Sequence, residues 1–376
     1  MPDPPNYAHL GDLDDRLGEE DRQVFDRLTS ISLSETEKEL AITPDFTAPG
    51  ETTLMALHFH PEWVPLDLIE KRLARAFPDA VDTFVIPTQH NKILTLGQWA
   101  GVEADVYCPE YGEKIHLLFH FKKSALQKAA TFQTMMEQTF RYRALQLLEI
   151  LSALTKPDES MAKGIKKSGL DSQALNLAGT FAARLSNLIA DPDHFDPHRS
   201  PMLKNRLLTD FILERGLEIP SAMLDRALSV VSLVKAMVKK RIDPSRFHTA
   251  REVIEEARSF GAGVVIPHPP LFWPALLDDL DVDGFEVWNP STPKHTLFLI
   301  QCLGRSQAQG RKLLPFMGDD THMSSKIRPE LSDEKSGKSR EIGFQPPWCL
   351  PEVKSALAAL GHSRERTMNE YRVKIA

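Results

Sequence analysis

Seven short apolar segments, each bounded by turn residues, constrain the fold of this chain more than any other feature. They are rich in β-branched and aromatic residues, as buried strands are. The segments span residues 52–60, 82–90, 101–108, 114–121, 261–269, 284–290 and 314–320. Helical patterns separate several of them, for example over 65–77, which starts at a proline, and over 249–263, which starts at a threonine cap. Strands that alternate with helices predict an α/β fold with a largely parallel sheet or barrel.

A long region between the fourth and fifth segments has helical patterns throughout, apart from a polar break over 156–169. Because it is too long for a loop, we interpret it as a helical insertion. The predicted parts are an acidic N-terminal extension with one helix over 1–50, a first part of the α/β domain over 51–121, the insertion over 122–247, a second part of the domain over 248–330, and a C-terminal linker and helical tail over 331–376.

Composition excludes several classes of protein. No apolar run approaches the roughly 18 residues of a membrane-spanning helix, and the acidic start lacks the features of a signal peptide. Three cysteines are too few for a disulfide framework or a cysteine-based zinc site, so a reduced, cytoplasmic protein without a membrane partner is expected. The net charge is -7, of which residues 1–50 contribute -8. The near-neutral remainder does not indicate strong non-specific binding of nucleic acid.

Residues that commonly bind metals gather at the ends of the predicted strands. They are His58 and His60 in the first segment, His90 in the second, Glu103 in the third, His116 in the fourth, His268 in the fifth, and Asp320 and His322 after the seventh. In parallel α/β folds the carboxyl ends of the strands share one face, so most of these side chains should converge. Each alone would be an ordinary loop or surface residue. Together, imidazoles and carboxylates predict a site for zinc, iron or manganese.

The order of these motifs resembles the PHP (polymerase and histidinol phosphatase) family of metal-dependent phosphoesterases. The matching stretches are HFH (58–60), TQHN (88–91), GVE (101–103), IHLL (115–118), VVIPHP (264–269), DGFEVWN (283–289) and GDDTH (318–322). The resemblance covers roughly residues 51–121 and 247–325. It implies a distorted (β/α)₇ TIM-like barrel that binds two or three divalent metal ions, with zinc, manganese and iron as the candidates.

The resemblance also implies individual roles. His58, His60, Glu103 and Asp320 match the ligands of a first metal, with Glu103 bridging; His116 and His268 match a second, and His90 and His322 complete the set. Glu103, Asp320 and His322 are the predicted catalytic residues. The chain departs from the family at two positions. Glu62 lies where the family has an aspartate after the first histidines, and Gln89 replaces an aspartate before His90. Both departures bear on whether a third ion binds.

Clustered divalent metals lower the pKa of a bridging water, so hydroxide can attack a phosphate ester near neutral pH. We therefore predict hydrolysis of a small phosphomonoester or nucleotide, with His322, His90 or a water protonating the leaving group. The alternatives are an exonuclease-type phosphodiesterase acting on nucleic-acid ends, a related amidohydrolase, and a non-catalytic PHP-like binding domain. The sequence does not predict the oligomeric state.

Further candidates have weaker support. They are His120, four residues after His116 in one strand, Asp319 and Asn289 beside the predicted site, His194 and His198 in a proline-rich stretch, and the lysine-rich segments 164–169 and 235–241. The lysine-rich segments are interpreted as solvated faces, with binding of a substrate phosphate as the alternative. His120 should face the same side of its strand as His116, and a half-buried strand residue is the alternative interpretation.

Overall fold

The computed structural model describes residues 16–169, 172–241, 246–277, 279–329 and 340–375. The chain forms two compact units. One, the helical unit, consists of Met1–Ser32 and Arg141–Asp243, and the other, the sheet unit, consists of Leu33–Phe140 and Pro244–Ala376. Among the described residues, no helix combines the length and the apolar character needed to cross a membrane.

The strands of the sheet unit form three hydrogen-bonded groups. They are β1 (Thr53–Ala56), β2 (Phe59–His60), β3 (Asp82–Val85), β4 (Leu94–Leu96), β5 (Trp99–Cys108), β6 (Glu113–Lys122), β7 (Gly263–Ile266), β8 (Gly284–Trp288), β9 (Leu314–Met317) and β10 (Thr321–His322). The largest sheet has the order β4-β5-β6-β7-β8-β9, and β1-β3 and β2-β10 are separate pairs. All seven predicted strands are present, whereas the edge strand β4 was not predicted.

The sheet is mixed rather than largely parallel. β7, β8 and β9 are parallel neighbours, as are β1 and β3 and β2 and β10. β6, however, runs antiparallel to both β5 and β7, because a tight turn at 109–112 joins β5 directly to β6 without a crossover helix. As a result the amino end of β6 lies beside the carboxyl half of β5, and Asp105 is paired across the strands with His116.

Further backbone hydrogen bonds extend the two strand pairs and connect the three groups of strands. They run from Asp320 N to His58 O (2.8 Å), from Met323 N to His60 O (3.0 Å), from Ile86 N to Ala56 O (2.9 Å), from Thr88 N to Phe59 O (2.9 Å) and from Asn91 N to Glu103 O (2.7 Å). Several of these bonds involve the predicted ligand residues themselves. The polar ends of the strands are therefore fixed against one another by main-chain contacts.

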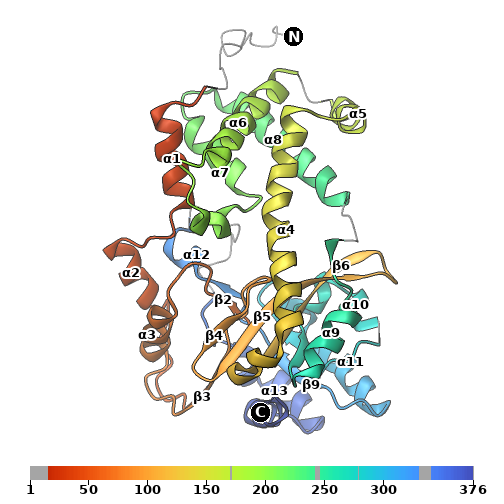
Figure 1. Ribbon diagram of the computed structural model, residues 1–376. Helices are drawn as coiled ribbons and strands as arrows, with labels where there is room; N and C mark the ends of the chain where they lie inside the picture. The colour runs from red at the N-terminus through yellow and green to blue at the C-terminus, as the bar shows by residue number, and fades with distance from the viewer. Residues whose placement is uncertain (1–15, 170–171, 242–245, 278, 330–339, 376) are drawn as a thin grey trace. The chain divides into compact units, whose positions relative to one another are not determined.

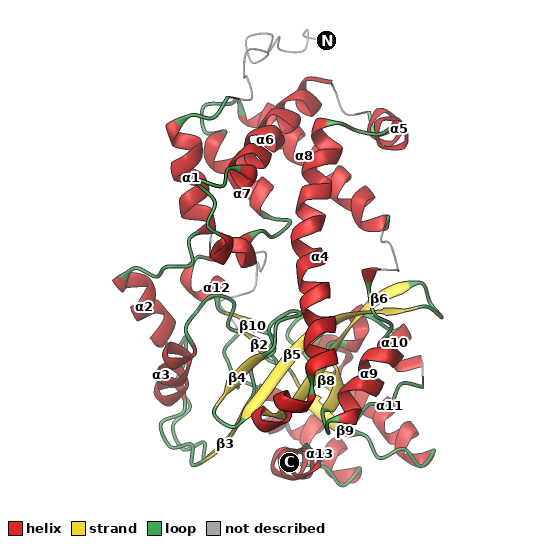
Figure 2. Cartoon of the chain, viewed as in Figure 1, coloured by secondary structure: helices red, strands yellow, loops and turns green. Residues whose placement is uncertain are grey.

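Helices surround these strands in the sheet unit. They are α2 (Glu35–Ile42), α3 (Leu66–Ala76), α9 (Ala250–Ser259), α10 (Pro274–Leu277), α11 (Thr296–Ala308), α12 (Ser324–Ile327), α13 (Pro351–Ala359) and α14 (Arg364–Lys374). Figure 2 shows α9 and α11 beside the sheet, where they contact β7 and β8 respectively. α9 begins with a capping box formed by Thr249 and Glu252, as its sequence predicts.

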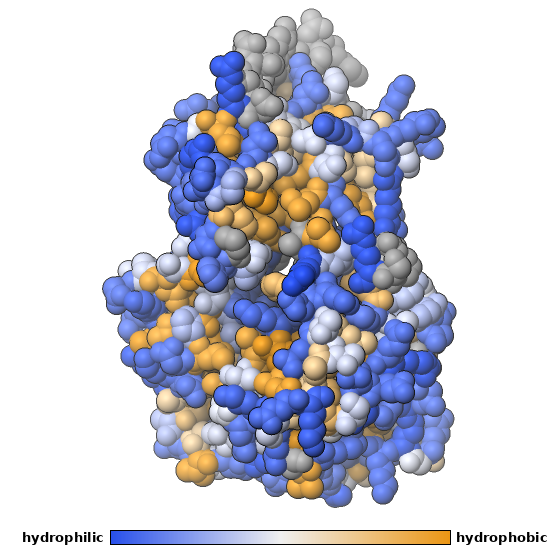
Figure 3. All heavy atoms as spheres, in the orientation of Figure 1, coloured by the Kyte–Doolittle hydropathy of each residue, from blue (hydrophilic) through white to orange (hydrophobic). Residues whose placement is uncertain are grey.

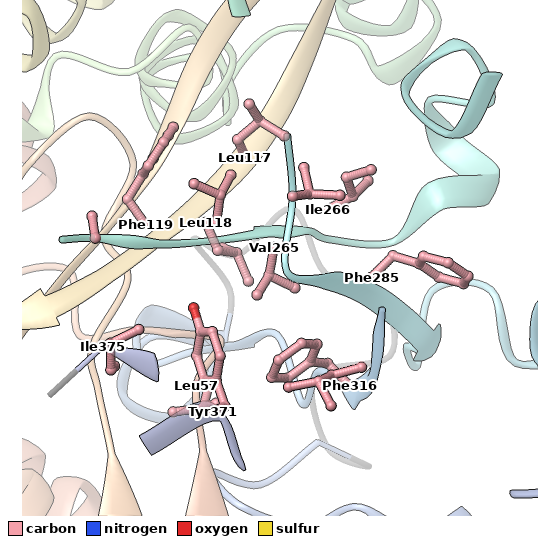
Figure 4. Packing of buried hydrophobic residues seen from close by; sticks show 14 of the residues in the cluster. Leu57, Leu117, Leu118, Phe119, Val265, Ile266, Phe285, Phe316, Tyr371 and Ile375 are labelled. Carbon is pink, nitrogen blue, oxygen red and sulfur yellow. The ribbon is translucent and has the colours of Figure 1, made fainter. Parts of the chain in front are cut away.

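The main core of the sheet unit is apolar and includes the C-terminal helix. Figure 4 shows Leu57 and Phe316 near Tyr371, which is part of α14, and Phe285 farther away in the same core. All four are buried. Gly263 makes room for this tyrosine, because a Cβ at that position would lie 2.3 Å from the Tyr371 hydroxyl. The C-terminal helix therefore contributes directly to the packing under the predicted site.

The helical unit is built from α1 (Glu19–Thr29), most of α4 (Ala130–Thr155), α5 (Glu159–Lys167), α6 (Ser172–Ala190), α7 (Leu207–Arg215) and α8 (Ser221–Lys240). Helix α1 packs against α6 and α7 (Figure 1) and is tied to them by an Arg215–Asp21 ion pair at 2.8 Å. The described residues of 122–247 form mainly helices, but the part up to Phe140, within the predicted insertion, belongs to the sheet unit. The break predicted over 156–169 is wrong, because Asp158 caps α5 within it.

Residues 1–50 also differ from the prediction of one helix. Their described part contains two, of which α1 belongs to the helical unit and α2 packs on α3 in the sheet unit.

Some leucines of the helical unit are exposed at its surface, among them Leu145, Leu213 and Leu217. Figure 3 shows apolar groups gathered on the face of this unit that is in view.

Candidate metal centre

The predicted ligand residues come together around one buried carboxylate, that of Glu103 on β5. Its oxygens lie near a nitrogen of five histidines: His58 Nε2 (3.8 Å), His60 Nε2 (3.3 Å), His90 Nδ1 (3.0 Å), His116 Nδ1 (2.9 Å) and His268 Nε2 (3.4 Å). Glu103 is 1% exposed. The strand ends therefore converge as their positions in the sequence predict.

Asp320 provides a second carboxylate near the same nitrogens of His58 and His60. Its Oδ1 lies 3.5 Å from His58 Nε2, 3.4 Å from His60 Nε2 and 3.7 Å from His322 Nε2. Arg340 contacts the same residue, donating from Nη1 to the Asp320 carbonyl at 2.8 Å. Asp320 thus joins the HFH segment to the DTH segment that follows β9.

Backbone strain concentrates at this site. Among the described residues, those other than glycine with positive φ are Glu62 (58°), Asn91 (52°), His268 (30°) and Asp320 (50°). Two of them are predicted ligands, and the other two are close neighbours of predicted ligands in the sequence. Such conformations cost roughly 1–3 kcal/mol each and persist where the surrounding structure enforces them. The chain accepts this cost to direct side chains into the site.

Several buried polar atoms of the site have no hydrogen-bond partner within the part of the chain that is described. They are His58 Nε2, both ring nitrogens of His60, both carboxylate oxygens of Glu103, His116 Nδ1 and His268 Nδ1. Leaving a buried polar atom unsatisfied costs about 1–3 kcal/mol. The number of unsatisfied atoms at this one site therefore indicates a missing partner. A cation bound by these nitrogens and oxygens would satisfy them.

The grouping of the ligand atoms also suits divalent ions. Three sets of atoms within 4.8 Å of one another are made of predicted ligands alone: His58, Glu103 and His268; His58, His60 and Asp320; and His60, His90 and His322. A fourth set adds Asp105 to His90 and His116. Mixed imidazole and carboxylate ligands are those that zinc, iron and manganese accept.

The electrostatics favour ligands in the right protonation states. Burial opposes ionisation of Glu103, but His90 and His116 beside it hold its pKa well below the usual range. Burial, helped by the nearby His322, lowers the pKa of His60 to about 4, so this ring is neutral. His58 is the opposite case: although burial lowers its pKa, Glu286, Asp320 and Glu103 raise it to about 10. The same negative charge that attracts a proton to His58 attracts a metal cation.

Glu286 is one functional residue that the sequence analysis missed. Its Oε1 lies 2.6 Å from His58 Nδ1, and its Oε2 accepts hydrogen bonds from His268 N (2.7 Å) and Asn289 Nδ2 (3.0 Å). A carboxylate on the outer nitrogen of a ligating histidine fixes the ring's orientation and tautomer. Gly318 leaves room for it, since a Cβ there would lie 1.9 Å from Glu286 Oε1. A glutamate within the apolar strand GFEVW was the signal available in the sequence.

Asp105 is the second residue that was missed. It is 4% exposed, and its Oδ1 lies 2.9 Å from His116 Nε2. Asn91 Nδ2 donates to its Oδ2 at 2.8 Å and Lys114 Nζ to its Oδ1 at 2.9 Å. The signal was its position two residues after Glu103, which places both carboxylates on the same face of β5.

Glu62 and Gln89, the two departures from the family pattern, are hydrogen-bonded to each other. The Glu62 N–H donates to Gln89 Oε1 at 2.8 Å, and Glu62 Oε2 accepts from Ser324 N at 2.6 Å. Its other oxygen lies 3.7 Å from His322 Nδ1. Within the described chain Glu62 is not part of any compact ligand group. Gln89 therefore holds the loop that carries Glu62, and Glu62 contacts a predicted ligand from outside the cluster.

The weaker candidates lie in varied surroundings. His120 is buried away from the cluster, with hydrogen bonds to Leu57 O (2.8 Å) and the Tyr371 hydroxyl (2.9 Å). Asp319 points away from the ligands and accepts from Gly343 N at 3.0 Å, and burial raises its pKa to about 7. His194 lies in the helical unit, 3.4 Å from Asp26. His198 lies in the same unit and is exposed.

Comparison with known proteins identifies no family for this chain. No protein-family model matches the chain, and no curated protein matches it. One similar solved structure is a crystal structure of a protein from Bifidobacterium adolescentis ATCC 15703 that carries the provisional name of a metal-dependent phosphoesterase. The identity is 14% and the TM-score 0.43, over 79% of this chain and 93% of the other. The chemistry of the site therefore has to be argued from its own residues.

Proposed function

We propose that this protein is a metal-dependent phosphoesterase of the PHP type, which hydrolyses a small phosphomonoester or nucleotide. The observation that carries the proposal is the Glu103 carboxylate, buried, surrounded by nitrogens of five histidines and without a hydrogen-bond donor of its own among the described residues. A carboxylate in that position could be shared by two divalent ions.

The residues present fit two or three divalent ions. His58, His60, Asp320 and Glu103 would hold one ion, and Glu103, His116 and His268 a second, while His90 lies near Glu103 and His322 near Asp320. Zinc, manganese and iron all accept this donor set. When bound, such ions make hydroxide available from water near neutral pH and neutralise the phosphate oxygens.

The protein's own groups orient the reaction. Glu286 holds His58 through its outer nitrogen, so that Nε2 faces Glu103 and Asp320. His322 is 23% exposed and lies at the accessible side of the cluster. Burial lowers its pKa, but Asp320 and Glu62 raise it to about 9, and we assign it the role of proton donor to the leaving oxygen. His90, 13% exposed, is the alternative donor.

The proposal includes a distorted (β/α)₇ barrel. Its support is that β5, β6, β7, β8 and β9 are hydrogen-bonded neighbours in that order, and that the chain continues from β9 into β10, which pairs with β2. The segment after β3 then bonds to both β2 and β5, through Thr88 and His90 respectively. Gly101 allows the last of these contacts, since a Cβ there would lie 2.6 Å from the Pro87 carbonyl. Seven strands joined in this way would bring all the ligands to one end.

The test combines metal analysis with activity. Protein purified with zinc, manganese or iron should contain about two or more equivalents of metal per chain, measured by mass spectrometry of the elements. It should hydrolyse members of a panel of phosphomonoesters, phosphodiesters and short oligonucleotides, and His58→Ala and Asp320→Ala should abolish that activity. Folded wild-type protein that takes up none of these metals would overturn the proposal.

A further inference from the structure

Two predicted ligand histidines, His58 and His116, each have a buried carboxylate on the ring nitrogen that faces away from Glu103. The arrangement at His116 is the less expected of the two. His116 Nδ1 lies 2.9 Å from Glu103 Oε1, and His116 Nε2 lies 2.9 Å from Asp105 Oδ1. The imidazole is therefore held between two carboxylates on one face of β5. The antiparallel register, which pairs Asp105 directly with His116, produces this arrangement.

The two carboxylates differ in what they already bind. Both oxygens of Glu103 lack a hydrogen-bond donor among the described residues. Asp105 accepts from Asn91 Nδ2 on one oxygen and from Lys114 Nζ on the other, and its backbone N–H donates to Asn91 Oδ1 at 2.8 Å. A carboxylate that binds a metal needs an oxygen available for the ion. Asp105 is instead fixed in place by donors, as a residue that orients another group would be.

We propose that Asp105 is a positioning residue, which holds His116 with its proton on Nε2 and so directs the lone pair of Nδ1 towards Glu103. This inference rests on the proposed function. A carboxylate can only accept, so it selects the tautomer whose N–H points at it. His116 Nδ1 and Glu103 Oε1 then form a pair of acceptors at 2.9 Å, which attract each other only through a cation bound by both.

The same argument applies to His58, with the two ring nitrogens exchanged. Glu286 lies 2.6 Å from His58 Nδ1, so His58 faces the cluster through Nε2. His58 and His116 would thus bind through opposite ring nitrogens, each set by its own carboxylate. Asp105 serves the second ion as Glu286 serves the first. A function for Asp105 as a direct ligand, with His90 and His116, is the competing interpretation.

The experiment compares Asp105→Ala and Asp105→Asn with Lys114→Met as a matched control, which removes one of the donors to Asp105 and leaves Asn91 in place. Zinc and manganese affinities are measured by chelator competition, and the number of ions by elemental analysis. Loss of such an outer partner typically costs 10–100-fold in metal affinity. We expect Asp105→Ala to weaken one ion by about that factor, Asp105→Asn to weaken it less because the amide oxygen still accepts, and Lys114→Met to leave it within about threefold.

The ¹⁵N shifts of His116 in the metal-bound wild type give a second measurement, which remains informative if Asp105→Ala does not fold. A protonated Nε2 and a metal-bound Nδ1 support the inference, and the reverse tautomer overturns it. Wild-type affinity in Asp105→Ala, or complete loss of one ion in Asp105→Asn, also overturns it, the latter because it marks a direct ligand. Failure of the wild type to bind metal overturns the proposed function itself, so the two failures are distinguishable.

Discussion

Strand β6 carries a partly exposed histidine, His116, and a buried one, His120, four residues apart, and their surroundings differ. His116 lies against Glu103, and its Nδ1 has no hydrogen-bond partner in the described chain. His120 has both ring nitrogens bonded, to Leu57 O at 2.8 Å and to the Tyr371 hydroxyl at 2.9 Å. Both point to the same side of the strand. What separates a candidate ligand from a structural histidine is therefore whether the fold has already satisfied it, which spacing alone does not reveal.

The same difference appears in their protonation. Burial lowers the pKa of both rings, but Glu103 and Asp105 reverse the effect at His116, whose pKa is raised. His120 has no carboxylate in hydrogen-bond contact, and burial lowers its pKa to about 3. His116 thus lies in a negative site suited to a cation. His120 is held as a neutral ring, and because Leu57 O can only accept, its proton lies on Nε2.

The largest predicted effect concerns metal binding at the cluster that contains His116. Glu103→Gln replaces the central carboxylate with an amide and removes the charge shared by five histidines. Outer partners of metal ligands are worth about 10–100-fold in affinity, so loss of the central ligand should exceed that range in both metal affinity and kcat/KM. His120→Gln is the matched control and should keep its metal. Equal metal content in the two variants would contradict the distinction drawn between the two histidines.

The next prediction tests whether ligand histidines depend on outer carboxylates. Gly318→Ala places a Cβ where Glu286 Oε1 now lies, at 1.9 Å, so Glu286 must move away from His58. We expect metal affinity and activity to fall by about 10–100-fold, as measured by chelator competition and phosphatase assay. Gly304→Ala, on α11, is a suitable control because its Cβ meets only the flexible Leu360 side chain, at 3.1 Å. Unchanged affinity in Gly318→Ala would show that Glu286 has no influence on the centre.

These contacts also explain what could be predicted from the sequence. The convergence of His58, Glu103, His268 and Asp320 follows from strand ends that share one face, and strand periodicity is readable from the chain. The roles of Glu286 and Asp105 depend instead on register and on the space left by Gly318, which only the folded pairing fixes. Reasoning from periodicity therefore finds the ligands better than the residues that hold them.

Contacts over long sequence separations were the least predictable. Arg340 falls in a polar stretch that resembles a linker, yet it is buried and donates to the Asp320 carbonyl. Gln345 Nε2 donates to Met55 O at 3.0 Å and to Met317 O at 2.7 Å, bridging β1 and β9. The Glu341 carboxylate accepts hydrogen bonds from both Nε and Nη2 of the buried Arg72. A polar composition indicates exposure, and nothing local in these residues shows that other segments will bury them.

The third prediction uses the pH dependence of stability. The folded pKa of His120 is about 3, below the usual value of about 6.5, so the unfolded chain binds the extra proton as pH falls. The contribution of neutral His120 to the free energy of unfolding is therefore fully present above pH 6.5. It is lost progressively as the pH falls from 6.5 towards 3. Linkage sets the slope at up to about 1.4 kcal/mol per pH unit.

Urea unfolding of the metal-free wild type and of His120→Gln, at pH 7 and at pH 5, measures this slope. The free energy of unfolding should fall further with acidification in the wild type, by about 2 kcal/mol, because the glutamine does not titrate. Metal-free protein is needed because ligand protonation would otherwise add to both curves. Parallel curves for the two proteins would show that His120 titrates normally and is not held neutral.

The smallest predicted effect concerns the hydroxyl that completes the bonding of His120. Tyr371→Phe removes the donor to His120 Nδ1 and leaves a buried acceptor unsatisfied, which costs about 1–3 kcal/mol of unfolding free energy. Tyr111→Phe, at a 40% exposed position, is the matched control and should change stability little. Because His120 is not part of the cluster, the metal content and affinity of Tyr371→Phe should equal those of the wild type. A loss of metal in this variant would mean that the brace from Tyr371 through His120 to Leu57 also positions His58, and the separation between the two histidines of β6 would then fail.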